Sequence, residues 1–251
     1  MARLATHEWG DPAGAPVVCL HGVTGHGERF GALAARLPGR RVVAFDLRGH
    51  GRSTWEAPWT VETHVADLVE TARSLGVERA TWLGHSFGGR LVAELATREP
   101  LVVERAVLVD PALHVAPADA TARAEGMRAD MSFATPDEAI DARLADGTLF
   151  TTPRSMLEDE AKMHLERHAD GLWRWRYSPA SVIAAWSVMA SAAPPLPAAP
   201  TLVVLGERSW IPNAIPARDG VVVVRVPGGH SILWDDFDAA AEAVASFLAA
   251  A

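Results

Sequence analysis

The segment Gly-His-Ser-Phe-Gly at residues 84–88 constrains the fold of this chain more than any other short stretch. It follows the apolar run 79–83, which is typical of a short buried strand, and it precedes residues 89–96, whose apolar positions recur with helical spacing. A serine between a strand and a helix, with glycine two residues before and two after, is the pattern of a nucleophile elbow. The turn presents the Ser86 hydroxyl outward, and the two glycines are needed because side chains there would clash with neighbouring backbone.

Apolar runs rich in β-branched residues alternate with helical patterns along much of the chain. Such alternation predicts an α/β fold with a mostly parallel, doubly wound sheet covered by helices on both faces. Residues 3–9 are expected to add an antiparallel edge hairpin. The predicted strands are 17–20, 41–45, 81–83, 106–109, 201–205 and 221–226, and the predicted helices are 29–37, 60–75, 89–98 and 239–250.

The pattern breaks after residue 111. The following stretch shows no run typical of a strand, and a proline-rich connector at 194–200 leads back to the next one. We therefore predict a helical lid at 112–199, inserted between strands of a core formed by residues 1–111 and 200–251. The expected features of the lid are polar helices at 137–144 and 155–168 and an aromatic-rich piece at 172–177.

Composition excludes several classes of partner. The chain has 251 residues, which suits one large α/β domain with an insertion. A formal net charge of −8 gives no electrostatic reason to expect nucleic acid or an anionic membrane as a partner. The N-terminus lacks the apolar stretch of a signal peptide and no run of 18 apolar residues occurs, so we expect a soluble cytoplasmic monomer or homodimer without a membrane span. The single cysteine, Cys19, lies in an apolar run and is expected to be a buried structural thiol.

A serine nucleophile needs a base, and His230 occupies a suitable position. It follows the last predicted strand, in the loop Pro-Gly-Gly-His-Ser at residues 227–231. The two glycines permit a tight loop that brings the imidazole over the carboxyl edge of the sheet.

An oxyanion formed at the serine needs two backbone N–H groups. One is expected from Phe87, the residue after the nucleophile, and the other from the loop His-Gly-Val-Thr-Gly at 21–25, which follows an early strand. Gly22 permits the bend that lets Val23 present its amide.

These motifs carry a family resemblance. The loop at 21–25, the stretch Asp-Leu-Arg-Gly-His-Gly-Arg-Ser at 46–53 and the elbow Gly-His-Ser-Phe-Gly-Gly resemble the α/β-hydrolase superfamily, in particular serine esterases and lipases with a helical lid. The resemblance covers the chain apart from the lid. It implies that Asp46 and Arg48 brace their loop rather than take part in catalysis.

A serine and a histidine usually act with a carboxylate as the third member of a catalytic triad. The position of this carboxylate in the chain departs from the pattern of the family. The resemblance implies a carboxylate in the loop after the penultimate core strand, where Ser209 and Trp210 stand instead. Asp110, at the end of the strand 106–109, is our preferred replacement, because a minority of the superfamily takes its acid from this strand and the order Ser, Asp, His is kept. Glu207 is the alternative source of the triad carboxylate. The other role open to Asp110 is to brace its loop.

The expected function is that of a serine hydrolase acting on a small or medium apolar ester or lactone, with no metal and no cofactor. A serine nucleophile argues against dehalogenases and epoxide hydrolases, which need a carboxylate. Arginines in the lid leave a carboxylate-bearing substrate open. The alternatives are a carbon–carbon bond hydrolase, a lyase or a perhydrolase on the same fold, and a ligand-binding receptor.

His164 and His168 are expected at a solvated surface. The expected pocket residues are His85, Met131, Trp175, Trp186 and Trp210.

Overall fold

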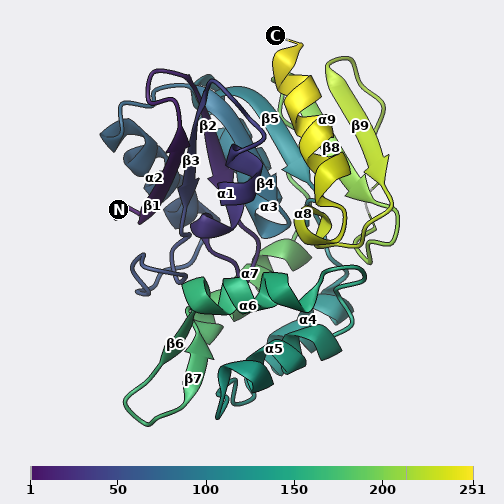
Figure 1. The fold of residues 1–251 in the computed structure, drawn as a ribbon. Helices are drawn as coiled ribbons and strands as arrows, with labels where there is room; N and C mark the ends of the chain where they lie inside the picture. Colours follow the sequence, from purple (N-terminus) through teal and green to yellow (C-terminus); the bar gives the residue numbers. More distant parts are fainter. Residues whose placement is uncertain (1, 213, 251) are drawn as a thin grey trace.

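A seven-stranded sheet forms the centre of the molecule (Figure 1). The computed structural model describes residues 2–212 and 214–250. The strand order is β1-β3-β2-β4-β5-β8-β9, and every pair is parallel except β1 with β3, so the predicted mostly parallel sheet is confirmed. The N-terminal strand lies at an edge and is antiparallel, as expected, but its partner is β3 and not the strand that follows it. The strands are β1 (Thr6–Gly10), β2 (Ala15–Leu20), β3 (Arg40–Phe45), β4 (Ala80–His85), β5 (Val103–Val109), β8 (Thr201–Gly206) and β9 (Val221–Val226).

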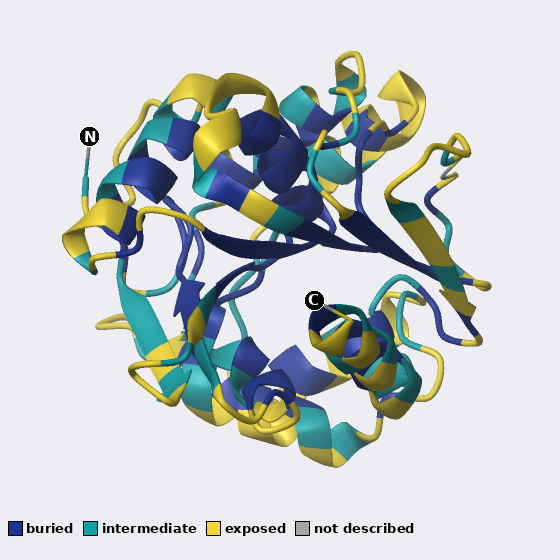
Figure 2. Cartoon of the chain, turned by 90° about the horizontal axis from the view of Figure 1, so that it is seen from above, coloured by how far each residue is buried: buried dark blue, intermediate teal, exposed yellow. Residues whose placement is uncertain are grey.

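Helices cover both faces of the sheet, and the central strands are buried between them (Figure 2). Because side chains alternate along a strand, Val17 and Cys19 of β2 pack with one layer while Val18 and Leu20 pack with the other. Burial raises the pKa of the Cys19 thiol above its ordinary value. The first layer contains η1 (Gly27–Phe30), α1 (Gly31–Ala34), α8 (Ile232–Asp235) and α9 (Phe237–Ala249), and the second contains α2 (Val61–Ser74), α3 (Phe87–Arg98) and η2 (Pro100–Val102).

The segment 112–199 leaves the sheet after β5 and returns at its neighbour β8, and it lies beyond the carboxyl ends of the strands (Figure 1). Its helices α4 and α7 extend the main core, whereas α5, α6 and β6 enclose a small core of their own around Ile140 and Leu157. No helix in the described ranges combines the length and apolarity needed to cross a membrane. The elements are α4 (Pro117–Gly126), α5 (Pro136–Ala145), α6 (Arg154–His164), β6 (Leu165–Arg167), β7 (Trp173–Trp175) and α7 (Pro179–Ala190).

Two expectations for this segment are wrong. It does contain strands, because β6 and β7 form an antiparallel hairpin, and the helix predicted to reach residue 168 ends at His164. The reason is turn chemistry: Gly171 has φ 85°, and its N–H donates to the carbonyl of His168 to close the hairpin. This local signal outweighs the helical pattern of the preceding residues.

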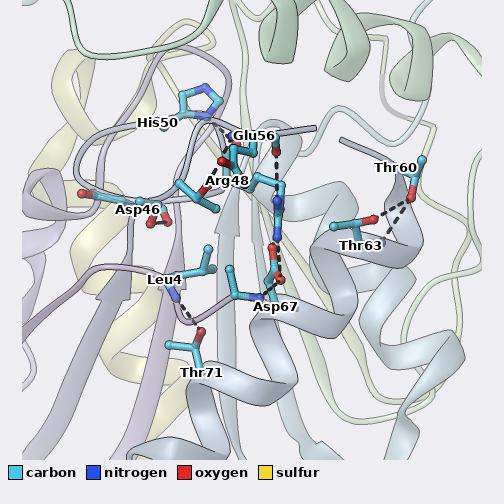
Figure 3. A network of polar contacts seen from close by, with 12 residues as sticks. Leu4, Asp46, Arg48, His50, Glu56, Thr60, Thr63, Asp67 and Thr71 are labelled. Carbon is cyan, nitrogen blue, oxygen red and sulfur yellow. Dashed lines mark hydrogen bonds and ion pairs between the residues drawn. The ribbon is translucent and has the colours of Figure 1, made fainter. Parts of the chain in front are cut away.

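The loop after β3 is braced by buried polar contacts (Figure 3). The Asp46 carboxylate accepts hydrogen bonds from the Gly27 N–H at 2.7 Å and the Arg52 N–H at 2.9 Å. The Arg48 guanidinium donates to both carboxylate oxygens of Asp67 in α2, at 2.6 and 3.1 Å. These contacts agree with the bracing role that the resemblance implies, and they fix the loops at the carboxyl edge of the sheet.

Candidate active site

Ser86 occupies the sharp turn between β4 and α3. Its backbone has φ 54° and ψ −118°, a left-handed conformation that is strained for any residue other than glycine. A Cβ atom at Gly84 would overlap the carbonyl group of Gly88, and one at Gly88 would overlap the carbonyl oxygen of Leu20. Both glycines are therefore required by close backbone packing, as the sequence pattern predicts.

His230 lies between Ser86 and Asp110. Its Nε2 is 2.9 Å from the Ser86 Oγ, and its Nδ1 is 2.6 Å from the Asp110 Oδ2. Since a carboxylate only accepts, Nδ1 carries the proton, and Nε2 is left to accept the hydrogen of the Ser86 hydroxyl.

His85 holds the loop that carries His230. Its Nε2–H donates to the His230 carbonyl at 2.9 Å. Burial, followed by the charge of His230, lowers the pKa of His85 to about 3, so this imidazole remains a neutral donor at ordinary pH.

Asp110 is buried at the end of β5 and is oriented by three donors. Besides His230, its carboxylate accepts the Gly206 N–H at 3.1 Å and the Ser209 hydroxyl at 2.5 Å. Glu207 does not approach His230: it is exposed, and its backbone N–H is bound to the Val226 carbonyl in β9. Of the two carboxylates considered from sequence, the structure brings only Asp110 into contact with the imidazole.

Backbone strain is concentrated around this site. Within residues 2–212 and 214–250, positive φ occurs at three residues other than glycine: Thr24 (63°), Ser86 (54°) and Asp110 (39°). Each lies at or just beyond the carboxyl end of a central strand. Strained residues other than glycine cluster at functional sites, so this concentration is consistent with a candidate functional site at this edge of the sheet.

The loop 21–25 lies against the serine. A Cβ atom at Gly22 would lie 2.9 Å from the Ser86 Cβ and 3.4 Å from its Oγ. Phe87 is the first residue of α3, so its N–H has no acceptor within the helix. The Val23 N–H has no hydrogen-bond acceptor in the described part of the chain. Both amides are thus without an acceptor in the described part of the chain, and Val23 lines the same cavity as Ser86.

A cavity of about 300 Å³ opens beside Ser86 and His230. All five residues expected in the pocket, namely His85, Met131, Trp175, Trp186 and Trp210, line it. Sequence reasoning missed Arg29, Tyr177 and Glu160, which come from distant segments and meet only through the fold. The wall is mainly aromatic and aliphatic, with a small number of charged groups.

Residues 17–246 match the model of the alpha/beta hydrolase family. The chain belongs to this family. Lipase LipV of Mycobacterium tuberculosis is 35% identical over 202 residues, which are 80% of this chain and 77% of that protein. An alpha/beta hydrolase from Novosphingobium aromaticivorans superimposes with a TM-score of 0.80 at 26% identity, over 100% of both chains. The enol-lactonase of Burkholderia xenovorans, at 22% identity, shares the fold with a TM-score of 0.80 over 98% of this chain and 96% of its own.

A buried charged cluster in this alpha/beta hydrolase joins α6 to the core. Glu160 of α6 accepts hydrogen bonds from the Arg29 guanidinium and from His26 Nε2, the latter at 3.0 Å. Arg29 and His26 hold the pKa of Glu160 well below its ordinary value, although burial opposes the shift. The cluster ties the 112–199 segment to the loop after β2.

His164 corrects one expectation from sequence. It is buried, with its ring stacked on His26 at 4.3 Å, whereas His168 is exposed. The expected solvated pair is therefore wrong for His164, because α6 ends there and the side chain packs inward against the core loop.

Proposed function

We propose that the chain is a serine hydrolase that cleaves small or medium apolar carboxylic esters or lactones through an acyl-enzyme. The observation that carries the proposal is the continuous contact from the Ser86 hydroxyl through the His230 imidazole to the buried Asp110 carboxylate, at 2.9 and 2.6 Å. This is the arrangement that nucleophilic acyl transfer by serine requires.

In the acylation step the Ser86 oxygen attacks the carbonyl carbon of the substrate, and His230 Nε2 takes the hydroxyl proton. The carbonyl oxygen becomes an oxyanion, which the Val23 and Phe87 amides stabilise. The imidazolium, held by Asp110, then gives its proton to the departing alkoxide, and an acyl ester of Ser86 remains.

Deacylation repeats these events with water. His230 takes a proton from the water molecule as its oxygen attacks the acyl carbon, and the proton then passes to the Ser86 oxygen as the acyl bond breaks. The products are a carboxylic acid and the regenerated hydroxyl of Ser86. For a lactone, the alcohol and the acid leave as one molecule.

The size and wall of the cavity support a compact, mostly apolar substrate. A volume of about 300 Å³ lies at the lower end of the range for small-molecule pockets. The likeness to Lipase LipV over most of both chains is in accord with ester hydrolysis. In this proposal the 112–199 segment is the lid, since its residues form the outer wall of the cavity.

The test is turnover of p-nitrophenyl esters from acetate to decanoate, together with a five- and a six-membered lactone, by the wild type and by Ser86→Ala. We expect a burst, an optimum at short chain length and loss of turnover in Ser86→Ala, while Ser246→Ala, altered at an exposed serine of α9, behaves as the wild type. A folded wild type that turns over no ester and no lactone would contradict the proposal, and product analysis would then address carbon–carbon cleavage.

A further inference from the structure

The charged groups that line the cavity are not balanced. Three arginines face it, Arg29, Arg123 and Arg143, against the single carboxylate of Glu160. Arg29 is paired with Glu160. Arg143 is paired with Asp146 and donates to the Thr148 hydroxyl at 2.7 Å.

Arg123 has no such partner. Across residues 2–212 and 214–250, no carboxylate forms an ion pair with its guanidinium. Asp146 and Asp119 are near enough to raise its pKa, but burial lowers the pKa by more. An arginine remains charged under these conditions, so the cavity wall carries one positive charge that is partly desolvated and not neutralised by contact.

Two aromatic rings lie against this guanidinium. Its Cζ lies 3.9 Å from the centroid of Trp210 and 5.6 Å from that of Trp186. The two indoles are 6.2 Å apart and inclined by 43°. A guanidinium that contacts an aromatic ring through cation–π attraction does not use up its N–H groups, which can still donate to an acceptor.

The same indole connects Arg123 with the catalytic centre. The Trp210 centroid is 5.5 Å from that of His230 and 3.9 Å from the Arg123 Cζ, so the Cζ lies within about 10 Å of the imidazole. A substrate whose carbonyl carbon contacts Ser86 could therefore reach Arg123 with a group only a few bonds away, across an apolar wall.

We propose that Arg123 is a carboxylate subsite and that the substrate is an ester with an apolar body and one carboxylate. This inference rests on the proposed function of Ser86. A planar carboxylate matches the fork of a stacked guanidinium in two parallel hydrogen bonds. One uncompensated positive charge matches a monoanion, whereas a phosphate monoester carries close to two negative charges. The substrate is a half-ester of a dicarboxylic acid if the carboxylate is on the acyl side, and an ester of a hydroxy acid if it is on the alcohol side.

The experiment compares charged and neutral ester pairs. On the acyl side the pair is p-nitrophenyl hydrogen adipate and p-nitrophenyl hexanoate, and on the alcohol side it is 4-acetoxybenzoate and 4-acetoxybenzamide. For at least one pair we expect kcat/KM to favour the carboxylate in the wild type. Arg123→Gln should reduce the ratio of the two kcat/KM values by at least tenfold, mainly through KM. Arg128→Gln, which alters an exposed arginine just after α4, should leave the ratio as in the wild type. An unchanged ratio in Arg123→Gln for both pairs would overturn the subsite.

A binding measurement separates this inference from the proposed function. Calorimetry on Ser86→Ala should show tighter binding of hexanoate than of hexanamide, and the preference should vanish in Ser86→Ala with Arg123→Gln. If the wild type turns over esters but no Arg123-dependent preference exists, the subsite alone is wrong. If no ester is turned over yet hexanoate binds in this way, the proposed function fails and the subsite stands.

Discussion

Asp110 and Ser209 are joined by a hydrogen bond of 2.5 Å between the carboxylate and the hydroxyl, across the neighbouring strands β5 and β8. Ser209 stands where the resemblance to α/β-hydrolases implies an acid. Here that position does not supply the carboxylate but helps to orient one that belongs to the adjacent strand. The Gly206 N–H at the end of β8 adds a second contact to the same carboxylate, at 3.1 Å.

Asp110→Asn should lower kcat by roughly 10³- to 10⁴-fold, because an amide cannot hold the imidazole in the required tautomer or stabilise the imidazolium. The measurement is kcat for p-nitrophenyl acetate, with circular dichroism to show that the variant folds. Glu207→Gln is the matched control and should retain wild-type kcat. The opposite result, collapse of activity in Glu207→Gln and retention in Asp110→Asn, would exclude Asp110 from the triad.

Ser209→Ala should lower kcat about tenfold and leave KM within about twofold, since it removes one charge-assisted hydrogen bond from Asp110 and keeps the triad. The pH profile of kcat should move as well, because the carboxylate that supports His230 loses a donor. An identical profile and kcat in the variant would reduce the Ser209 contact to a structural detail of the loop.

Gly22→Ala should remove most of the activity, because the added Cβ would lie 2.9 Å from the Ser86 Cβ and 3.4 Å from its Oγ. The loss should be seen in kcat with an intact fold. Gly126→Ala is the control: a Cβ at the end of α4 meets no atom within 4 Å, so the variant should be active and slightly more stable. Near-normal kcat in Gly22→Ala would mean that the loop moves aside without consequence.

Stability should fall steeply as the pH drops from about 6.5 to 4. Burial lowers the pKa of five histidines from the ordinary 6.5, to about 4 for His50 and His64, to about 3 for His85, and well below 6.5 for His21 and His164. The unfolded chain therefore binds more protons than the folded one in this window, and stability is lost as the pH falls below the ordinary histidine pKa.

Urea denaturation at pH 7, 6 and 5 measures this effect. The control is His168→Gln, which alters an exposed histidine and should keep the same slope with pH. The carboxylates of Asp46 and Glu160, whose pKa values are held low, contribute a loss only at more acidic pH. A free energy of unfolding that is flat between pH 7 and 5 would contradict the burial of these imidazoles.

Much of the fold was predictable because local and long-range signals agree. The β-branched runs that become β2, β3, β4, β5 and β8 are largely buried on both faces, so they stand out as continuous apolar stretches. The edge strand β9 is also a valine-rich run, although Val222 and Val223 are exposed. Ser86 and His230 can be identified for a similar reason. Ser86 directly follows β4 between two glycines that close backbone packing requires, and His230 lies in a glycine-containing loop shortly after β9.

The remaining features depend on contacts that no local pattern encodes. The choice between Asp110 and Glu207 is a question of which side chain points toward His230, and spacing along the chain does not answer it. The burial of His164 is not predictable from its own segment, because its ring stacks on that of His26, a residue 138 positions earlier. The β6–β7 hairpin was missed because its strands have only three residues each.

In the proposed triad, the position of Asp110 at the end of β5 has a consequence for directed evolution of this hydrolase. Ser86 and Asp110 directly follow paired strands, with His85 opposite Val109 in the register of β4 and β5. The loop that begins at Glu207 is left to shape the pocket, with Trp210 as its most prominent wall. A randomised library over that loop that retains Ser209 would therefore sample new substrate ranges while Ser86 and Asp110 stay in place at the ends of their paired strands.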